Sequence, residues 1–163
     1  NVSVPYCADD GTNQSSTQLD GGGAYAIPVD VGAEQCLSFN IMRTDNSPDW
    51  NVEFYSGAIS VAGNVQKDFS FPALITIQGK TTDANGVPVA GVKLRFYGNG
   101  ATTAGDDSRL LGSFSATSDA RGAYTLQVPP MDYLIEVAPP VASVGVTKSS
   151  MVTLQESKTL DLS

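Results

Sequence analysis

Apolar and polar residues alternate most clearly over residues 75–97. Residues 75–80 read ITIQGK, and a period of two puts successive side chains on opposite faces of a strand. The turn at residues 83–86 contains Asn85-Gly86, a strong hairpin signal because both residues tolerate positive φ. The pattern therefore predicts a hairpin whose second strand covers residues 87–97.

The same alternation continues to the end of the chain, interrupted by regular turn signals. No window shows the 3.6-residue period of an amphipathic helix. Short strands at this spacing are typical of an all-β sandwich or barrel. The predicted strands are 74–80, 88–97, 110–117, 123–128, 133–137, 143–147, 151–154 and 158–162.

The first seventy residues repeat the turn and strand signals of the last ninety. Residues 20–29 match residues 119–128 at a constant offset of 99, including an Asp-x-x-Gly turn followed by Tyr25 or Tyr124. Three further segments match in the same order, namely 37–41 with 133–137, 59–61 with 152–154, and 67–71 with 158–162. Chance similarity is the alternative, but order and alternation agree. We therefore predict two tandem modules, 1–72 and 73–163.

The first copy has no counterpart of residues 75–91, so the first module lacks its opening hairpin. A sandwich without an edge pair leaves backbone N–H and C=O groups unpaired. Three explanations remain open. The missing residues were cut off upstream, another chain supplies the strand, or a smaller sheet closes by itself and is stabilised by a disulfide. Because the chain begins at Asn1 without Met, we expect a processed product or an excised fragment.

Three stretches carry a family resemblance: residues 77–92, IQGKTTDANGVPVAGV; residues 117–124, TSDARGAY; and residues 133–135, YLI. Together they resemble the carboxypeptidase regulatory-like domain. The resemblance implies a transthyretin-like, Ig-like β-sandwich of about seven strands. It implies little about function, because such modules occur as spacers, stalks, sugar-binding accessories and anchors in secreted proteins.

The charge of the chain is acidic and uneven. Net charge is −8; residues 1–72 hold nine acidic and two basic residues, whereas residues 73–163 hold eight and seven. Such a surface disfavours nucleic acid and anionic membranes, and no apolar run is long enough to span a membrane. The two cysteines, Cys7 and Cys36, are interpreted as one disulfide formed in an oxidising compartment, with two buried thiols as the alternative.

Catalytic chemistry has little support in the sequence. The chain contains no His, which excludes a Ser-His-Asp triad and His-ligated metals, and neither cysteine has a base to activate it. We therefore expect no enzymatic activity and no cofactor. Oxygen-rich turns suit calcium, so Asp9, Asp10 and Asn13 are candidate ligands, although Asp and Asn are also ordinary turn residues.

The only Trp lies in the segment PDWNVEFY, residues 48–55. Trp50 and Tyr55 together form a candidate ligand surface, because aromatic rings stack on sugar rings; the alternative is that Trp50 covers its own core. The leading hypothesis is a non-catalytic extracellular structural or adhesive module pair, with neighbouring modules or subunits as partners. The alternatives are a filament subunit that accepts a strand into its first module, and a carbohydrate-binding accessory that uses Trp50.

Overall fold

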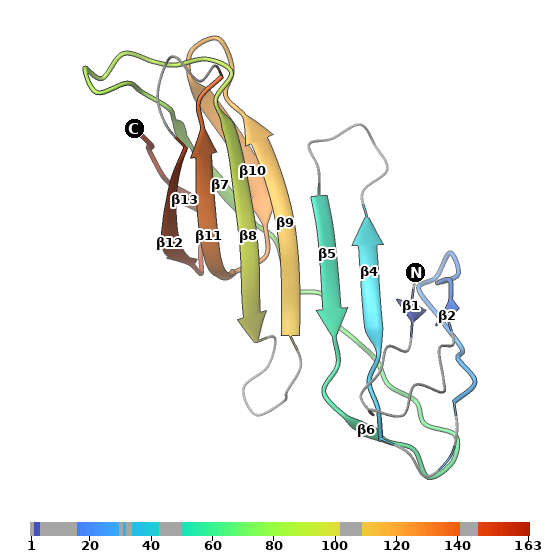
Figure 1. The fold of residues 1–163 in the computed structure, drawn as a ribbon. Helices are drawn as coiled ribbons and strands as arrows, with labels where there is room; N and C mark the ends of the chain where they lie inside the picture. Colours follow the sequence, from blue (N-terminus) through green and yellow to red (C-terminus); the bar gives the residue numbers. More distant parts are fainter. Residues whose placement is uncertain are drawn as a thin grey trace. The chain divides into compact units, whose positions relative to one another are not determined.

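The computed structural model describes residues 2–3, 16–29, 31, 34–42, 50–101, 109–140 and 147–163 (Figure 1). Every regular element in these residues is a β-strand, so the all-β prediction is confirmed for them. The part described contains no helix that could cross a membrane. The strands are β1 (Val2–Ser3), β2 (Ser16–Thr17), β3 (Glu34–Gln35), β4 (Ser38–Met42), β5 (Trp50–Tyr55), β6 (Ile59–Ser60), β7 (Ile75–Lys80), β8 (Lys93–Ala101), β9 (Arg109–Thr117), β10 (Ala123–Val128), β11 (Met131–Ala138), β12 (Lys148–Leu154) and β13 (Lys158–Thr159).

The chain divides into two compact units. The first comprises Asn1–Met42, Val52–Phe71 and Ala101–Leu111; the second comprises Arg43–Asn51, Pro72–Gly100 and Gly112–Ser163. The strands of the first unit follow the order β5-β4-β1-β2, with β3 paired to β6, and those of the second follow β12-β11-β8-β9 and β10-β7-β13.

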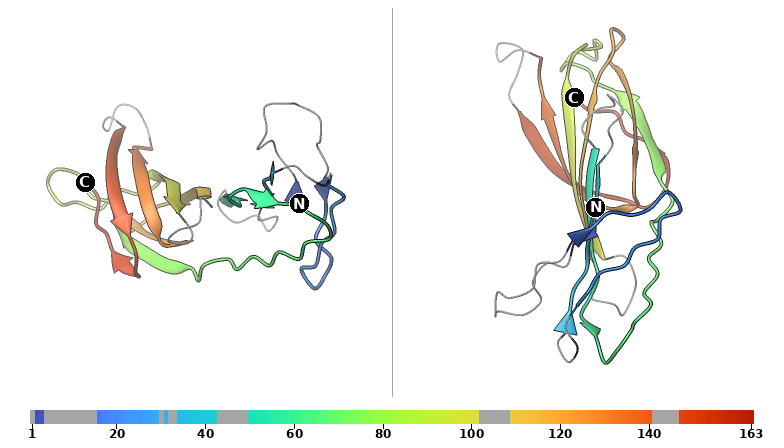
Figure 2. Two further views of the ribbon diagram at one scale, coloured as in Figure 1. Left: turned by 90° about the horizontal axis from the view of Figure 1, so that it is seen from below. Right: turned by 90° about the vertical axis from the view of Figure 1, so that its right-hand side faces the viewer.

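The second unit has two layers, which the right-hand view of Figure 2 separates. In one layer β11 pairs antiparallel with both β8 and β12. In the other, β7 lies between β10, which is antiparallel to it, and β13, which is parallel to it. Alternate side chains of both layers are buried and form the core of the unit, as the sequence period requires. Its most buried members are Ile77, Leu94, Phe96, Phe114, Val128, Tyr133, Ile135 and Leu154.

The hairpin predicted over residues 75–97 is wrong, because β7 and β8 belong to different sheets. Antiparallel pairing around the turn is short: the Asp83 N–H donates to the Val87 carbonyl, and the Val89 N–H donates to the Thr81 carbonyl. Gly91 then adopts a φ of 73°. A residue with a Cβ reaches this region only with strain, so Gly91 allows the chain to leave β7 and enter the β8 layer.

Hydrogen bonds of Ser118 hold the start of β8 in its own layer. The Ser118 N–H donates to the Val92 carbonyl at 3.0 Å, and the Val92 N–H donates to the Ser118 Oγ at 3.0 Å. The Gly91 N–H donates to the Ser118 carbonyl. These bonds tie the residues before β8 to the residue after β9, so the pairing partner of β8 is set by Ser118 and not by the turn at Asp83.

Three turns of the chain have the same internal bonding. In each, an Asp carboxylate oxygen accepts the N–H groups two and four residues later, at 2.8–2.9 Å. The Asp residues are Asp20, Asp83 and Asp119. The third residue after each Asp is a glycine of φ between 73° and 83°. The Asp-x-x-Gly signal in the sequence is therefore one local structure used three times.

The last residues of the chain lie along β7. The Leu160 N–H donates to the Gln78 carbonyl at 2.8 Å, and the Leu162 N–H donates to the Lys80 carbonyl at 2.8 Å. Gly79 has no room for a side chain, because a Cβ there would overlap the Leu160 carbonyl oxygen and lie 3.1 Å from the Tyr124 ring. The Tyr124 hydroxyl crosses this glycine and donates to the Leu160 carbonyl at 2.5 Å. The burial of Tyr124, with Asp161 nearby, raises its pKa.

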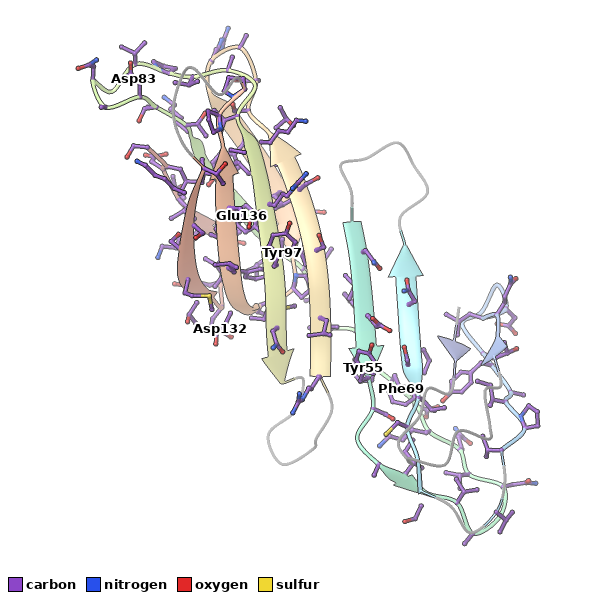
Figure 3. The ribbon with its side chains drawn as sticks, viewed as in Figure 1. Tyr55, Phe69, Asp83, Tyr97, Asp132 and Glu136 are labelled. Atoms are coloured by element: carbon purple, nitrogen blue, oxygen red, sulfur yellow. The ribbon has the colours of Figure 1, made fainter. Side chains whose placement is uncertain are left out.

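The first unit has a small aromatic core. Phe39 of β4 packs against Phe54 of β5 with ring centroids 5.9 Å apart, and Phe69 lies 4.3 Å from Phe39 and 5.2 Å from Phe54. Tyr25 meets Phe39 edge to face at 5.4 Å. Figure 3 shows Phe69 beside the lower end of β5. Of these rings Phe39 and Phe54 are buried, whereas Tyr25 and Phe69 are half-buried. The other buried apolar side chains in the described part of this unit are Leu37, Val52, Val61 and Leu110.

Candidate ligand-binding face

One exposed row of apolar side chains crosses three strands of the second unit. On β11 the buried Tyr133 and Ile135 alternate with Leu134, which faces outward and is half-buried. The pairing register places Leu134 directly opposite Tyr97 of β8 on one side and Met151 of β12 on the other. Tyr97 is 38% exposed and Met151 is 70% exposed. We call this row, Tyr97, Leu134 and Met151, the Tyr97 face.

Polar rows flank the Tyr97 face on both sides. On one side Asp132 stands opposite Asn99 and Thr153, and the Thr153 hydroxyl donates to the Asp132 carboxylate at 2.6 Å. Figure 3 shows Asp132, Tyr97 and Glu136 along this sheet. The Thr153 bond fixes the Asp132 carboxylate beside the apolar row, where its remaining lone pairs can accept further hydrogen bonds.

The row on the other side contains opposite charges. Glu136 stands opposite Arg95 of β8 and Ser149 of β12. Directly opposed residues on antiparallel strands have Cβ atoms about 4.5–5.5 Å apart, so an acidic and a basic residue stand side by side at this edge of the apolar row. The arrangement can stack a flat apolar surface on Tyr97 and accept or donate hydrogen bonds around it.

Tyr55, which the sequence proposed as a ligand contact, belongs to a polar cluster on β4 and β5. The Ser38 hydroxyl donates to the Glu53 carboxylate at 3.0 Å. A hydrogen bond to Glu53, together with partial burial, raises the pKa of Tyr55 to about 12. The Tyr55 hydroxyl is thus held by its own neighbour on the strand.

Trp50 and Tyr55 both belong to strand β5. Val52 and Phe54 of the same strand are buried, at 0% and 8% exposure. The side chain of Trp50 lies outside the described residues. The ligand surface of Trp50 and Tyr55 therefore stays a prediction, as does the alternative that Trp50 covers its own core.

The other predicted site residues fall largely outside the part described. The calcium candidates Asp9, Asp10 and Asn13 lie outside the described residues, so the calcium site stays a prediction. In the described ranges no group of three or more acidic or Cys side chains is placed to hold a metal. Cys7 also lies outside them, whereas Cys36 is half-buried and is not a free thiol. The Cys7–Cys36 pairing therefore stays a prediction.

A shallow depression on the outside of β7 and β13 offers little for binding. It measures about 230 Å³ and is lined by Thr76, Gln78, Ser157, Lys158 and Thr159. Sites for small ligands usually measure about 300–1,000 Å³ and are mostly apolar. This depression is smaller and is lined mainly by polar side chains.

Sequence reasoning missed the Tyr97 face. Its three members are separated by 37 and 17 residues (97 to 134, 134 to 151), and each one alone reads as an ordinary exposed position. The available signal was the parity of the three strands, which becomes informative only once their register is known.

No family model, curated protein or solved structure matches the chain.

Proposed function

We propose that the chain is a non-catalytic pair of extracellular, Ig-like or transthyretin-like modules, resembling the carboxypeptidase regulatory-like domain, that adheres to glycans through the Tyr97 face. The observation that carries the proposal is the exposed apolar row between two rows of hydrogen-bonding side chains. The row is one residue wide on each of three strands. A protein partner usually buries about 800 Å² on each side, so this small row fits a sugar ring better than it fits a protein surface.

Two correspondences support the module pair. The order β5-β4-β1-β2 of the first unit repeats the order β12-β11-β8-β9 of the second, when each strand is matched in chain order. β5 then corresponds to β12, in place of residues 59–61, which the sequence had matched with residues 152–154 and which lie at β6, paired to β3. The Asp20 and Asp119 turns also have matching hydrogen bonds, and each is followed by a tyrosine whose hydroxyl donates to a backbone carbonyl. Duplication of one module accounts for both observations.

Two further observations support an extracellular location. Cys36 is not a free thiol, and cysteines that are stably oxidised belong mainly to secreted and surface proteins. The net charge of −8 keeps a surface module soluble and does not favour association with nucleic acid.

A glycan array tests the proposal with the wild type and three variants. Tyr97→Ser and Met151→Ser should each weaken glycan binding by about fivefold or more, because loss of one stacked aromatic ring or an apolar neighbour removes about 1–3 kcal/mol. Thr125→Ala, an exposed residue of β10 in the other sheet, should bind as the wild type does. The proposal fails if no glycan binds, or if binding is the same in the Tyr97 and Thr125 variants.

A further inference from the structure

The second sheet of the second unit shows what its middle strand requires. β7 is bonded on both sides, from Ala123↔Lys80 to Val128↔Ile75 on the β10 side and through Lys158↔Ile77 and Thr159↔Gln78 on the β13 side. Tyr124 crosses β7 at Gly79 to reach the Leu160 carbonyl. The middle strand therefore needs alternating apolar residues that face the core and a glycine beneath the tyrosine.

The first unit contains both neighbours of such a strand. Residues 25–29 follow the Asp20 turn as β10 follows the Asp119 turn. Residues 66–70 overlap the segment 67–71, which the sequence matches with residues 158–162 at the end of the second unit. The Tyr25 hydroxyl donates to the Lys67 carbonyl at 2.8 Å. The Tyr124 hydroxyl likewise donates to the Leu160 carbonyl, two residues further along the matched segment. One tyrosine bridge thus joins the two segments, as in the second unit.

Among the described residues of the first unit, none takes the place of this middle strand. Within the described ranges, residues 25–29 and 66–70 belong to no strand, and none of their backbone N–H or C=O groups bonds to another backbone group. Extended backbone with unpaired groups is a template for an added strand. The aromatic core at Phe39, Phe54 and Phe69 lies next to these segments, because Tyr25 and Phe69 are part of it.

We propose that the first unit accepts a β-strand from outside these 163 residues, between residues 25–29 and residues 66–70. The added strand runs antiparallel to 25–29 and parallel to 66–70, as β7 runs relative to β10 and β13. It has the chemistry of β7, with apolar residues at alternate positions and a glycine beneath Tyr25. This inference rests on the module-pair part of the proposed function and is independent of the Tyr97 face.

A synthetic peptide with the sequence of residues 74–82, LITIQGKTT, serves as the probe. Its binding to the full chain is measured by fluorescence anisotropy, and the site is located by amide hydrogen exchange. We expect exchange at residues 25–29 and 66–70 to slow by tenfold or more when the peptide is bound. The same peptide with Gly79→Val should bind at least tenfold more weakly, since valine has no room beneath the tyrosine.

Two variants of the chain complete the test. Tyr25→Phe should weaken peptide binding, because the hydroxyl bridge over the added strand is lost, whereas Tyr124→Phe in the second unit should not change it. The inference is overturned if the peptide does not bind, if both peptides bind equally, or if exchange slows elsewhere. It is also overturned if residues 25–29 and 66–70 are already strongly protected without peptide. Any of these results leaves the glycan-array prediction for Tyr97 unaffected.

Discussion

Gly79→Ala is expected to detach the end of the chain from the second unit. The added methyl group would overlap the Leu160 carbonyl oxygen and lie 2.6 Å from the Leu160 carbonyl carbon. These atoms are backbone and cannot turn aside as a flexible side chain could. The terminal segment must move away from β7, and the hydrogen bond from the Tyr124 hydroxyl to Leu160 is lost with it.

The free-energy cost follows from these two changes. Overpacking in a core costs about 1–3 kcal/mol, and a lost hydrogen bond adds about 1 kcal/mol. We therefore expect Gly79→Ala to lower the free energy of unfolding by roughly 2–4 kcal/mol. For a unit of this size, 1 kcal/mol corresponds to about 4–8 °C in Tm, so the unfolding temperature of the second unit should fall by about 10 °C or more.

Calorimetry measures the temperature change, and hydrogen exchange locates it at residues 75–80 and 157–162. Gly63→Ala, in the first unit, is the control for a glycine substitution that leaves the second unit unchanged, because an added Cβ there meets no atom within 4 Å and the residue has no positive φ. Gly86→Ala separates strain from overlap, since position 86 is open but has a φ of 79°. The reasoning is refuted if Gly79→Ala unfolds at the same temperature as Gly63→Ala.

A double variant identifies the cause of the loss. Tyr124→Phe alone removes the hydroxyl and should cost about 1 kcal/mol. If Gly79→Ala has already displaced Leu160, adding Tyr124→Phe should cost less than it does in the wild type, because residues that share a partner are not additive. Additive costs would show that Leu160 stays in place, contrary to the overlap.

Three further predictions concern Tyr55, Asp119 and the two cysteines. Tyrosinate absorbance, compared between wild type and Tyr55→Phe, should give Tyr55 a pKa of about 12, and Glu53→Gln should return it toward about 10. Because the folded pKa is raised, the contribution of Tyr55 to stability is complete below pH 10 and is lost between about pH 10 and 12. Two backbone N–H groups lower the pKa of Asp119. The contribution of Asp119 to the free energy of unfolding is therefore present above about pH 4 and lost as the pH falls further. Below about pH 4, the free energy of unfolding in urea should depend less on pH in Asp119→Ala than in the wild type. Alkylation of the denatured chain should label Cys7 and Cys36 only after reduction; labelling before reduction would disprove their pairing.

The positions of most strands could be predicted from the sequence, because each strand carries its own period of two. The strand predicted at 123–128 has the bounds of β10, and the one predicted at 110–117 begins one residue after β9 does. The one predicted at 143–147 falls on residues outside the part described, except for Thr147, which is not in a strand. Local alternation decides which residues are extended and which face is buried.

The pairing of strands could not be predicted in the same way. Asn85-Gly86 is a local signal, and it formed only the short pairing around residues 81–89. The partners of β7 lie about 50 and 80 residues further along the chain, where no local pattern specifies register. The bonds of Ser118 and the φ of Gly91 decide that β8 joins the other layer, and a serine or a glycine in sequence has many possible roles.

The candidate face depended on the same missing information. The sequence drew attention to Trp50 because it is the only tryptophan in the chain. Tyr97, Leu134 and Met151 had no distinguishing feature until the register set them in one row.

The parallel pairing of β7 with the end of the chain bears on how the second unit responds to tension. β7 is its first strand, and residues 157–162 are its last. A pull on residue 75 in one direction and on residue 162 in the other would slide the two strands along each other. Such a pull would load the hydrogen bonds between the two strands at the same time, in shear, and they would not break one after another from one end. These bonds join Gln78 to Leu160, Lys80 to Leu162 and Thr82 to Leu162. Forced unfolding depends on the unfolding rate, so a module of this topology suits a protein that is stretched between two attachment points.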